Sequence, residues 1–287
     1  MQRILVAIDF SGDSFNALEH AILMANVLGT HLRMVHVNHN DEFVLPYDQD
    51  FNESQKPRSI KEYLSFLLKN HLPKYKVENG IFDYKIRKGK VYVEISNQAH
   101  YDDSLLIICG THGVSGFEEY LLGSNAFRIV SQALCPVLTI RHGFMPEPIK
   151  TIVLPIDVTN QSRRKVPFAI DLATAFNANI HVLGVHETSG NEVVSKITQY
   201  VDQVYELITN KGIKVEKKIN TGTNITKITI EYAKLVNAGM IIIMTEQTES
   251  SENIWLGPYA RQMVNHSHIP ILCIHPKDQE KYEFIQK

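Results

Sequence analysis

The stretch Arg3-Ile-Leu-Val-Ala-Ile-Asp9 returns as Thr151-Ile-Val-Leu-Pro-Ile-Asp157, which lies 148 positions later in the chain. Both copies are short apolar runs that end on an aspartate, a pattern typical of a buried strand that leads into a polar turn. The runs 32–37 and 180–185 keep the offset of 148, and the runs 136–140 and 270–274 match at an offset of 134. The chain is therefore an internal repeat of one folding unit.

Each copy alternates short β-branched runs with segments of helical periodicity. In the first copy the pattern predicts strands at 3–9, 31–37, 82–87, 104–109 and 136–141. Strands that alternate with helices favour a parallel sheet covered on both faces. We expect an α/β fold of two tandem doubly wound, Rossmann-like domains, at residues 1–143 and 149–276, with a short proline-containing linker between them.

The drop in offset between the two ends of the repeat indicates an insertion in the first copy. We place it at 38–59, a polar segment with Pro46 and Pro57 and little periodicity. Long irregular segments in compact domains are either passive surface loops or functional lids and partner contacts. Both interpretations stay open for this segment.

The bulk composition limits the classes of function. Of the 287 residues, 44% are hydrophobic and 21% are charged, which is enough apolar material for packed cores, and the net charge of −2 gives no basic footprint for nucleic acid or an anionic membrane. No apolar run approaches the roughly 18 residues that a membrane span requires, and Met1 leads directly into a strand pattern without a signal peptide. We expect a cytoplasmic protein whose partners include neither nucleic acid nor membrane.

The three cysteines, Cys109, Cys135 and Cys273, lie in or beside apolar runs and show no metal-ligand spacing. We expect buried, reduced thiols.

A glycine-containing loop follows the apolar run 105–109. It reads Gly110-Thr-His-Gly113, then Gly123-Ser124 before a predicted helix from Asn125. Glycines let backbone N–H groups approach an anion, and a helix N-terminus favours negative charge. The spacing is neither the dinucleotide fingerprint nor the P-loop. The loop is thus a candidate phosphate site of another type.

This loop resembles that of the ATP-binding universal stress proteins. Four further features carry the resemblance with it: Asp9 at the first strand end, Val35-His-Val37, Gly89 before a helix, and the run 133–138. The resemblance covers about residues 1–141 and, more weakly, 149–275. It implies a fold like that of the adenine nucleotide alpha hydrolases and an adenine nucleotide as ligand. It assigns contacts with adenine, ribose or phosphates to Ala7, Ile8, Asp9, Val37, Cys109, Gly110, His112, Gly113, Gly123, Ser124 and Asn125.

The chemistry of these side chains suits such a ligand. Asp9 can accept a hydrogen bond from a ribose hydroxyl or help to hold a bridging Mg²⁺, and Ser124 can donate to a phosphate oxygen. We therefore expect ATP as the cofactor, with Mg²⁺ as an optional companion and no metal site built from protein alone. An alternative for Asp9 is a purely structural role, in which it bonds loop amides or caps the next helix.

The second copy departs from the motif. Gly110 is matched by Met244, His112 by Glu246, Gly113 by Gln247 and Ser124 by Pro258. These changes prevent the close approach of the backbone to an anion, remove one amide donor and add negative charge. We expect a structural partner domain, and the family resemblance implies that it pairs with the first inside one chain through 136–140 and 270–274, while further association into a homodimer stays open. The alternative is a less acidic or more apolar ligand, for which Met244 and Trp255 are candidates.

A dedicated enzyme is not expected. The segment Ser11-Gly12-Asp13-Ser14 is similar to the pyrophosphatase loop of adenylating enzymes but has one glycine too few. No nucleophile with a neighbouring base is evident. The expected function is an ATP-binding protein of stress response or regulation; a slow ATPase and a scaffold for a non-nucleotide ligand or partner are the alternatives.

Overall fold

The computed structural model describes residues 1–38, 56–111, 123–187, 190–245 and 256–275. Most of the predicted insertion, together with Trp255, lies outside the described residues. In the first half the elements are β1 (Arg3–Ala7), α1 (Gly12–Leu28), β2 (His31–Asn38), α2 (Ile60–His71), η2 (Leu72–Lys74), β3 (Phe82–Lys88), α3 (Val91–Tyr101), β4 (Ser104–Gly110), α4 (Ser124–Gln132) and β5 (Val137–Ile140).

The second half repeats this order. Its elements are β6 (Thr151–Ile156), η3 (Gln161–Arg163), α5 (Val166–Phe176), β7 (Asn179–His186), α6 (Asn191–Asn210), β8 (Val215–Thr221), α7 (Ile225–Leu235), β9 (Met240–Met244), α8 (Pro258–His266) and β10 (Ile271–Ile274). The predicted α/β class with alternating strands and helices is confirmed.

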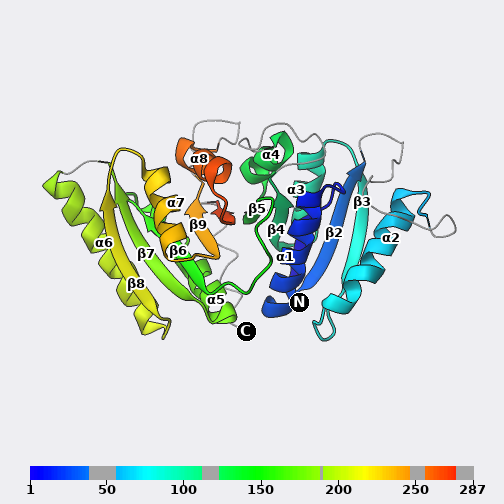
Figure 1. Cartoon of the computed structure of the whole chain (residues 1–287), viewed down its shortest axis with the longest axis horizontal. Coiled ribbons are helices and arrows are strands. Elements are labelled where there is room, and N and C mark those ends of the chain that lie inside the picture. Colours follow the sequence, from blue (N-terminus) through cyan, green and yellow to red (C-terminus); the bar gives the residue numbers. More distant parts are fainter. Residues whose placement is uncertain (39–55, 112–122, 188–189, 246–255, 276–287) are drawn as a thin grey trace.

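The strands of the described residues form one ten-stranded sheet in the order β3-β2-β1-β4-β5-β10-β9-β6-β7-β8 (Figure 1). Neighbours within each half run parallel, whereas β5 and β10 pair antiparallel, with Leu138 opposite Leu272. The runs 136–140 and 270–274, which we expected to approach each other, therefore meet at the middle of the sheet. This pairing gives each of the two strands a partner from the other half, so neither is left as an open edge.

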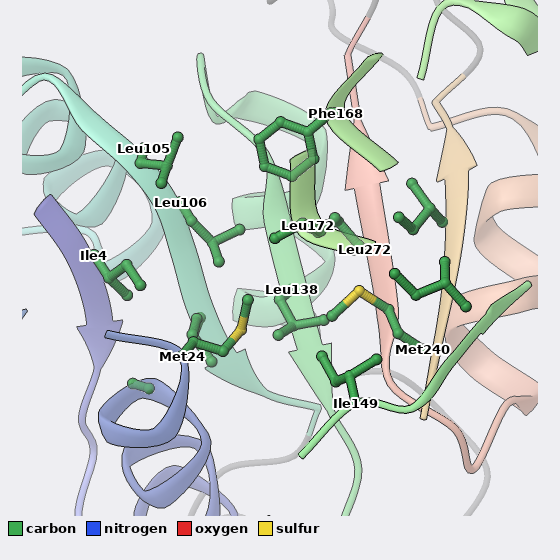
Figure 2. Close-up of a cluster of buried hydrophobic side chains, with 14 of the residues drawn as sticks. Ile4, Met24, Leu105, Leu106, Leu138, Ile149, Phe168, Leu172, Met240 and Leu272 are labelled. Carbon is green, nitrogen blue, oxygen red and sulfur yellow. The ribbon is translucent and has the colours of Figure 1, made fainter. Parts of the chain in front are cut away.

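Helices cover both faces of the sheet. On one face, α1, α2, α5 and α6 bury a hydrophobic cluster that continues from the first half into the second. Figure 2 shows Leu138, Leu272, Met240 and Ile149 of this cluster side by side at the junction. On the other face, α3, α4, α7 and α8 bury a second cluster. Burial of this apolar surface holds the two halves together as well as each half alone.

Local sequence signals set the helix boundaries. Ser11 caps α1, because its Oγ accepts the N–H of Ser14 at 3.2 Å, and Gly29 ends that helix in the left-handed region at a φ of 61°. Ser59 caps α2 in the same way by accepting the N–H of Glu62. Each of these two helices thus begins at a serine that satisfies a first-turn amide.

A buried ion network stabilises the edge of the first half that carries the amino ends of its strands. Arg33 of β2 donates Nε and Nη2 to Asp83 and Nη1 to Asp102, each at 2.6 Å. Arg3 lies within 3.8 Å of the same two carboxylates. This network is on the opposite edge of the sheet from the carboxyl ends of the strands, where ligands bind in doubly wound folds.

None of the helices in the described part of the chain is long and apolar enough to cross a membrane.

Candidate functional site

The main candidate site is a cavity of about 330 Å³ at the carboxyl ends of β1 and β4. These two strands are the point where the strand order of the first half reverses, the usual ligand position in doubly wound sheets. The cavity is lined by Ala7, Ile8, Asp9, Ser14, Val35, Val37, Val91, Ile95, Cys109, Gly110, Thr111, Gly123, Ser124, Asn125, Ala126 and Ile129. Nothing in this list is basic.

Most of the sequence-predicted site residues meet in this one cavity. Those that line it are Ala7, Ile8, Asp9, Val37, Cys109, Gly110, Gly123, Ser124 and Asn125. His112 and Gly113 lie outside the described residues. The sequence reasoning missed Val91, Ile95 and Ile129, although Gly89, singled out before a predicted helix, pointed to the start of α3 where Val91 stands.

One part of the cavity lining is an apolar slot. It is formed by Val37 from β2, Val91 and Ile95 from α3, Cys109 from β4 and Ile129 from α4. Burial raises the pKa of the Cys109 thiol to about 12, so this group stays protonated and behaves as a small apolar side chain. Such a slot suits a flat, apolar ring.

Asp9 has a structural role through one carboxylate oxygen, and its other oxygen is available to a ligand. Its Oδ1 accepts hydrogen bonds from the backbone N of Ser11 at 3.0 Å and from Ser11 Oγ at 2.5 Å, which fixes the turn that caps α1. The structural alternative for Asp9 is therefore correct for one of its oxygens. Among the described residues, the hydrogen bonds to this carboxylate all go to Oδ1, and Asp9 lines the cavity, so Oδ2 can still accept from a ligand.

The backbone that carries Asp9 is held by an aromatic cluster behind the cavity. Phe10 has a φ of 68°, in the left-handed region that a bulky residue rarely adopts. Its ring stacks on His36 at 4.4 Å and meets Tyr63 edge-on at 4.9 Å, while His36 Nδ1 lies 2.8 Å from the carbonyl oxygen of Ile8. Burial lowers the pKa of His36, which keeps the stacked imidazole neutral near pH 7.

Another part of the cavity lining is the N-terminus of α4. Gly123 is the cap residue and offers no side-chain hydrogen bond to the first turn, and the residues of that turn line the cavity, so among the described residues no side-chain cap satisfies their amide donors. The N–H of Gly123 donates to the carbonyl oxygen of Thr111 at 2.7 Å. This bond brings the end of β4 to the start of α4 and places the positive end of the helix dipole beside the strand ends.

Gly110 is required for a reason other than the one its sequence motif suggests. A Cβ added there would lie 2.8 Å from Cβ of Asp13 and 3.0 Å from its carbonyl carbon. The missing side chain thus lets the first turn of α1 pack against the end of β4. Gly110 lines the cavity, but packing within the fold accounts for the glycine.

The second half has a pocket of about 440 Å³ in the corresponding place, at the carboxyl ends of β6 and β9. The aspartate turn is kept, because Asp157 Oδ1 accepts from the backbone N of Thr159 at 2.7 Å and from its Oγ1 at 2.5 Å. The phosphate features are altered: Met244 lines the pocket at the end of β9, and Pro258 begins α8 without an N–H. Here η3 replaces the first turn of the helix, and α5 starts only at Val166.

Comparisons with known proteins agree with the fold and the repeat. The family model described as the universal stress protein family matches residues 1–141 and again 148–275. The universal stress protein YxiE of Bacillus subtilis is 30% identical over 147 residues, which cover 48% of this chain and 98% of that protein. A universal stress protein of Methanocaldococcus jannaschii is 25% identical over 145 residues, covering 46% of this chain and 85% of that protein.

A solved universal stress protein from Archaeoglobus fulgidus has the same fold over nearly the whole length. It superposes with a TM-score of 0.71 at 20% sequence identity, covering 96% of this chain and 98% of the other. The twofold match of the family model, together with these relatives, shows that the chain belongs to the universal stress protein family, with two family units in tandem.

Proposed function

We propose that the first half of this chain binds ATP in the cavity between β1 and β4 and that the protein acts in stress response or regulation as a nucleotide-binding protein. The observation that carries the proposal is the presence of three features in the lining of one cavity: an apolar slot, a carboxylate and a helix N-terminus without a side-chain cap. An adenine nucleotide presents a flat ring, a ribose and phosphates, one part for each of these features.

Each feature meets one part of the ligand. The adenine fits between Val37, Val91 and Ile129, where burial of the ring contributes most of the affinity. A ribose hydroxyl donates to Oδ2 of Asp9. The phosphate oxygens accept from Ser124 and from the first-turn amides of α4.

A divalent cation would need the phosphates for most of its ligands. The described residues hold no group of three or more His, Cys, Asp or Glu side chains that could bind a metal, and Asp9 is the carboxylate that lines the cavity. Mg²⁺ commonly binds through one or two carboxylates together with substrate phosphates, so Asp9 and the phosphates fit it as a companion of the nucleotide. Its contribution would be to neutralise phosphate charge next to Asp9.

The proposal is for a binding protein with at most slow hydrolysis of bound ATP. In the described lining, the thiol of Cys109 is held protonated and the Oγ of Ser14 donates to the carbonyl oxygen of Ser11. The thiol is therefore not in its nucleophilic form, and the hydroxyl of Ser14 is engaged with the backbone. Turnover measured with saturating ATP and Mg²⁺ decides between a binding protein and a slow ATPase.

We also propose that the two halves act as an intramolecular counterpart of a dimer. The antiparallel pairing of β5 with β10 and the apolar cluster that crosses the junction support this reading. The cytoplasmic location that we expect from the sequence stays a prediction.

The repeat supplies a matched pair of variants for the test. Val91 and Ile225 are equivalent positions at the starts of α3 and α7, and each lines the cavity of its own half. Tryptophan at Val91 fills the adenine slot, so we expect Val91→Trp to weaken ATP binding by about tenfold or more in calorimetric titration, whereas Ile225→Trp retains it. Equal affinity of wild type and Val91→Trp would reject the site, and absence of ATP binding by the wild-type protein would reject the function.

A further inference from the structure

The pocket of the second half contains a buried lysine that has no counterpart in the first. Lys165, at the start of α5, lines this pocket with only 2% of its surface exposed, and its Nζ donates to the backbone oxygen of Ser162. The equivalent position of the first half is Ala17. A buried ammonium group is costly unless an anion or several acceptors compensate it, so its presence at a cavity wall points to a ligand that supplies the compensation.

Within the described residues, the partners of this ammonium group are one backbone oxygen and one carboxylate. Asp157, at the end of β6, is the carboxylate that acts on Lys165, but its Oδ1 is occupied by the backbone and hydroxyl of Thr159. Thr159 and Asp157 also line the pocket, so the polar end offers one cation, one partly engaged anion and hydroxyl or carboxamide groups. A ligand with one negative charge fits this end better than one with several.

The other end of the pocket is apolar. It is lined by Val185, Ile225, Ile243, Met244 and Tyr259. Met244 stands where the first half has Gly110, and Pro258 removes an amide from the start of α8. A polyphosphate would lose these donors and would face the charge of Asp157, whereas a hydrocarbon or aromatic body gains buried contact.

We propose that the pocket of the second half binds a small carboxylate with an apolar body, whose carboxylate pairs with Lys165 and whose body packs on Val185, Ile225 and Ile243. This site is separate from the ATP cavity and does not depend on the function proposed for it. One buried amine that a bound carboxylate keeps protonated, hydroxyl and carboxamide groups in the lining, and an apolar wall together define this class of ligand.

Binding of a carboxylate should be coupled to uptake of a proton. Burial lowers the pKa of Lys165 to about 7, and a carboxylate beside it would raise that pKa again. Among the described residues, the other ionisable groups that line the pocket are Asp157 and Tyr259, and His275 bonds the hydroxyl of Thr245, which also lines it. Burial lowers the pKa of His275 to about 4, so this imidazole stays neutral between about pH 6 and pH 8 and does not contribute.

The test uses 2-naphthoate, a bicyclic aromatic carboxylate, and its neutral twin 2-naphthamide as probes of the full chain. At about pH 8, calorimetry in two buffers of different ionisation enthalpy should show saturable 2-naphthoate binding with uptake of about one proton, which falls toward zero near pH 6. The affinity for 2-naphthamide should be lower by about tenfold or more.

Two variants locate the probe. Lys165→Met, which keeps the volume of the side chain and removes its charge, and Ile225→Trp, which fills the apolar end, should each weaken 2-naphthoate about tenfold or more, while Val91→Trp in the first cavity retains it. If Lys165→Met fails to fold, proton uptake by the wild-type protein and the affinity of Ile225→Trp for 2-naphthoate still test the proposed site.

Four results overturn the proposal. They are no saturable binding of 2-naphthoate, equal affinities for 2-naphthoate and 2-naphthamide, no proton uptake at about pH 8, and a loss of 2-naphthoate binding in Val91→Trp but not in Ile225→Trp. The ATP titration is a separate measurement on the first cavity, so failure of one proposal is distinguishable from failure of the other.

Discussion

Arg141 and Asn265 connect the two halves of the chain, because Nη1 of Arg141, just after β5, donates to the backbone oxygen of Asn265 near the end of α8 at 2.7 Å. Arg141 is 5% exposed, and the same Nη1 lies 3.5 Å from the carbonyl oxygen of Ser267. The last carbonyl groups of a helix have no partner within it and attract positive charge. Arg141 thus completes the end of α8 from across the β5–β10 junction.

Arg141→Met should therefore destabilise the whole chain. We expect a loss of about 2 kcal/mol in the free energy of unfolding, measured with urea, because buried carbonyl acceptors lose a charged donor. The matched control is Arg87→Met, which removes an exposed pair with Glu94 at 3.1 Å and should change stability by less than about 1 kcal/mol. Equal effects of the two substitutions would show that Arg141 does not stabilise the junction.

Removing Arg33 should cost more. Its guanidinium bonds both oxygens of Asp83 and one of Asp102, whose side chain is 5% exposed. Arg33→Met leaves this buried carboxylate without its closest cation, so we expect a loss of about 3 to 5 kcal/mol in urea unfolding. Lys217→Met, which breaks an exposed pair with Asp202, serves as the control and should leave the urea midpoint nearly unchanged. A wild-type-like midpoint for Arg33→Met would contradict the role assigned to the network.

The stability of the fold should fall in mild acid because of His275. Burial lowers its pKa from 6.5 to about 4, so between these values the unfolded chain binds a proton at this site and the folded chain does not. Stability from this group is therefore fully present above about pH 6.5 and is lost as the pH falls toward 4, by up to about 3 kcal/mol.

The variant His275→Gln isolates this contribution. Glutamine keeps a polar side chain near Thr245 and has no proton to bind in this range, and the other buried histidines remain in both proteins. We expect the slope of stability against pH between about 4 and 6.5 to be shallower in His275→Gln than in the wild type. Parallel curves would mean that His275 does not titrate with folding.

The cysteines should be unreactive in the native protein. All three are buried and free of disulfides; burial raises the pKa of Cys109 to about 12 and raises that of Cys273 well above its usual range. Because the thiolate is the reactive form, an aromatic disulfide reagent at about pH 8 should label none of them within minutes, and all of them in guanidinium chloride. Rapid labelling of one thiol in the native protein would show that its site opens to solvent.

Much of the architecture could be predicted from the repeat. The equivalence of Asp9 with Asp157 predicted that each half opens with a strand that leads into a polar turn, and the alternation of strand and helix patterns predicted the α/β class. These features follow from periodicity, which a sequence displays directly. The central pairing of 136–140 with 270–274 was expected from the family resemblance.

Features that depend on packing between distant segments could not be predicted. The motif around Gly110 indicated a phosphate contact, yet the nearest constraint on that glycine is Asp13 of α1. The support of Asp9 by Phe10 and His36 joins two strands through a stacked pair that no spacing reveals. Lys165 was passed over because a lysine near a helix start is usually exposed, and only the fold shows that this one is enclosed.

The pairing of Leu138 with Leu272 inside a single polypeptide has a consequence for how the two sites can differ. In an assembly of two identical chains every amino-acid replacement is made twice, once in each copy. In this chain a replacement affects one half alone, so Lys165 can occupy the position that is equivalent to Ala17 in the first half. Such a chain can carry two different binding sites in a fixed one-to-one ratio and a fixed mutual orientation. A symmetric homodimer cannot, because its two sites are identical.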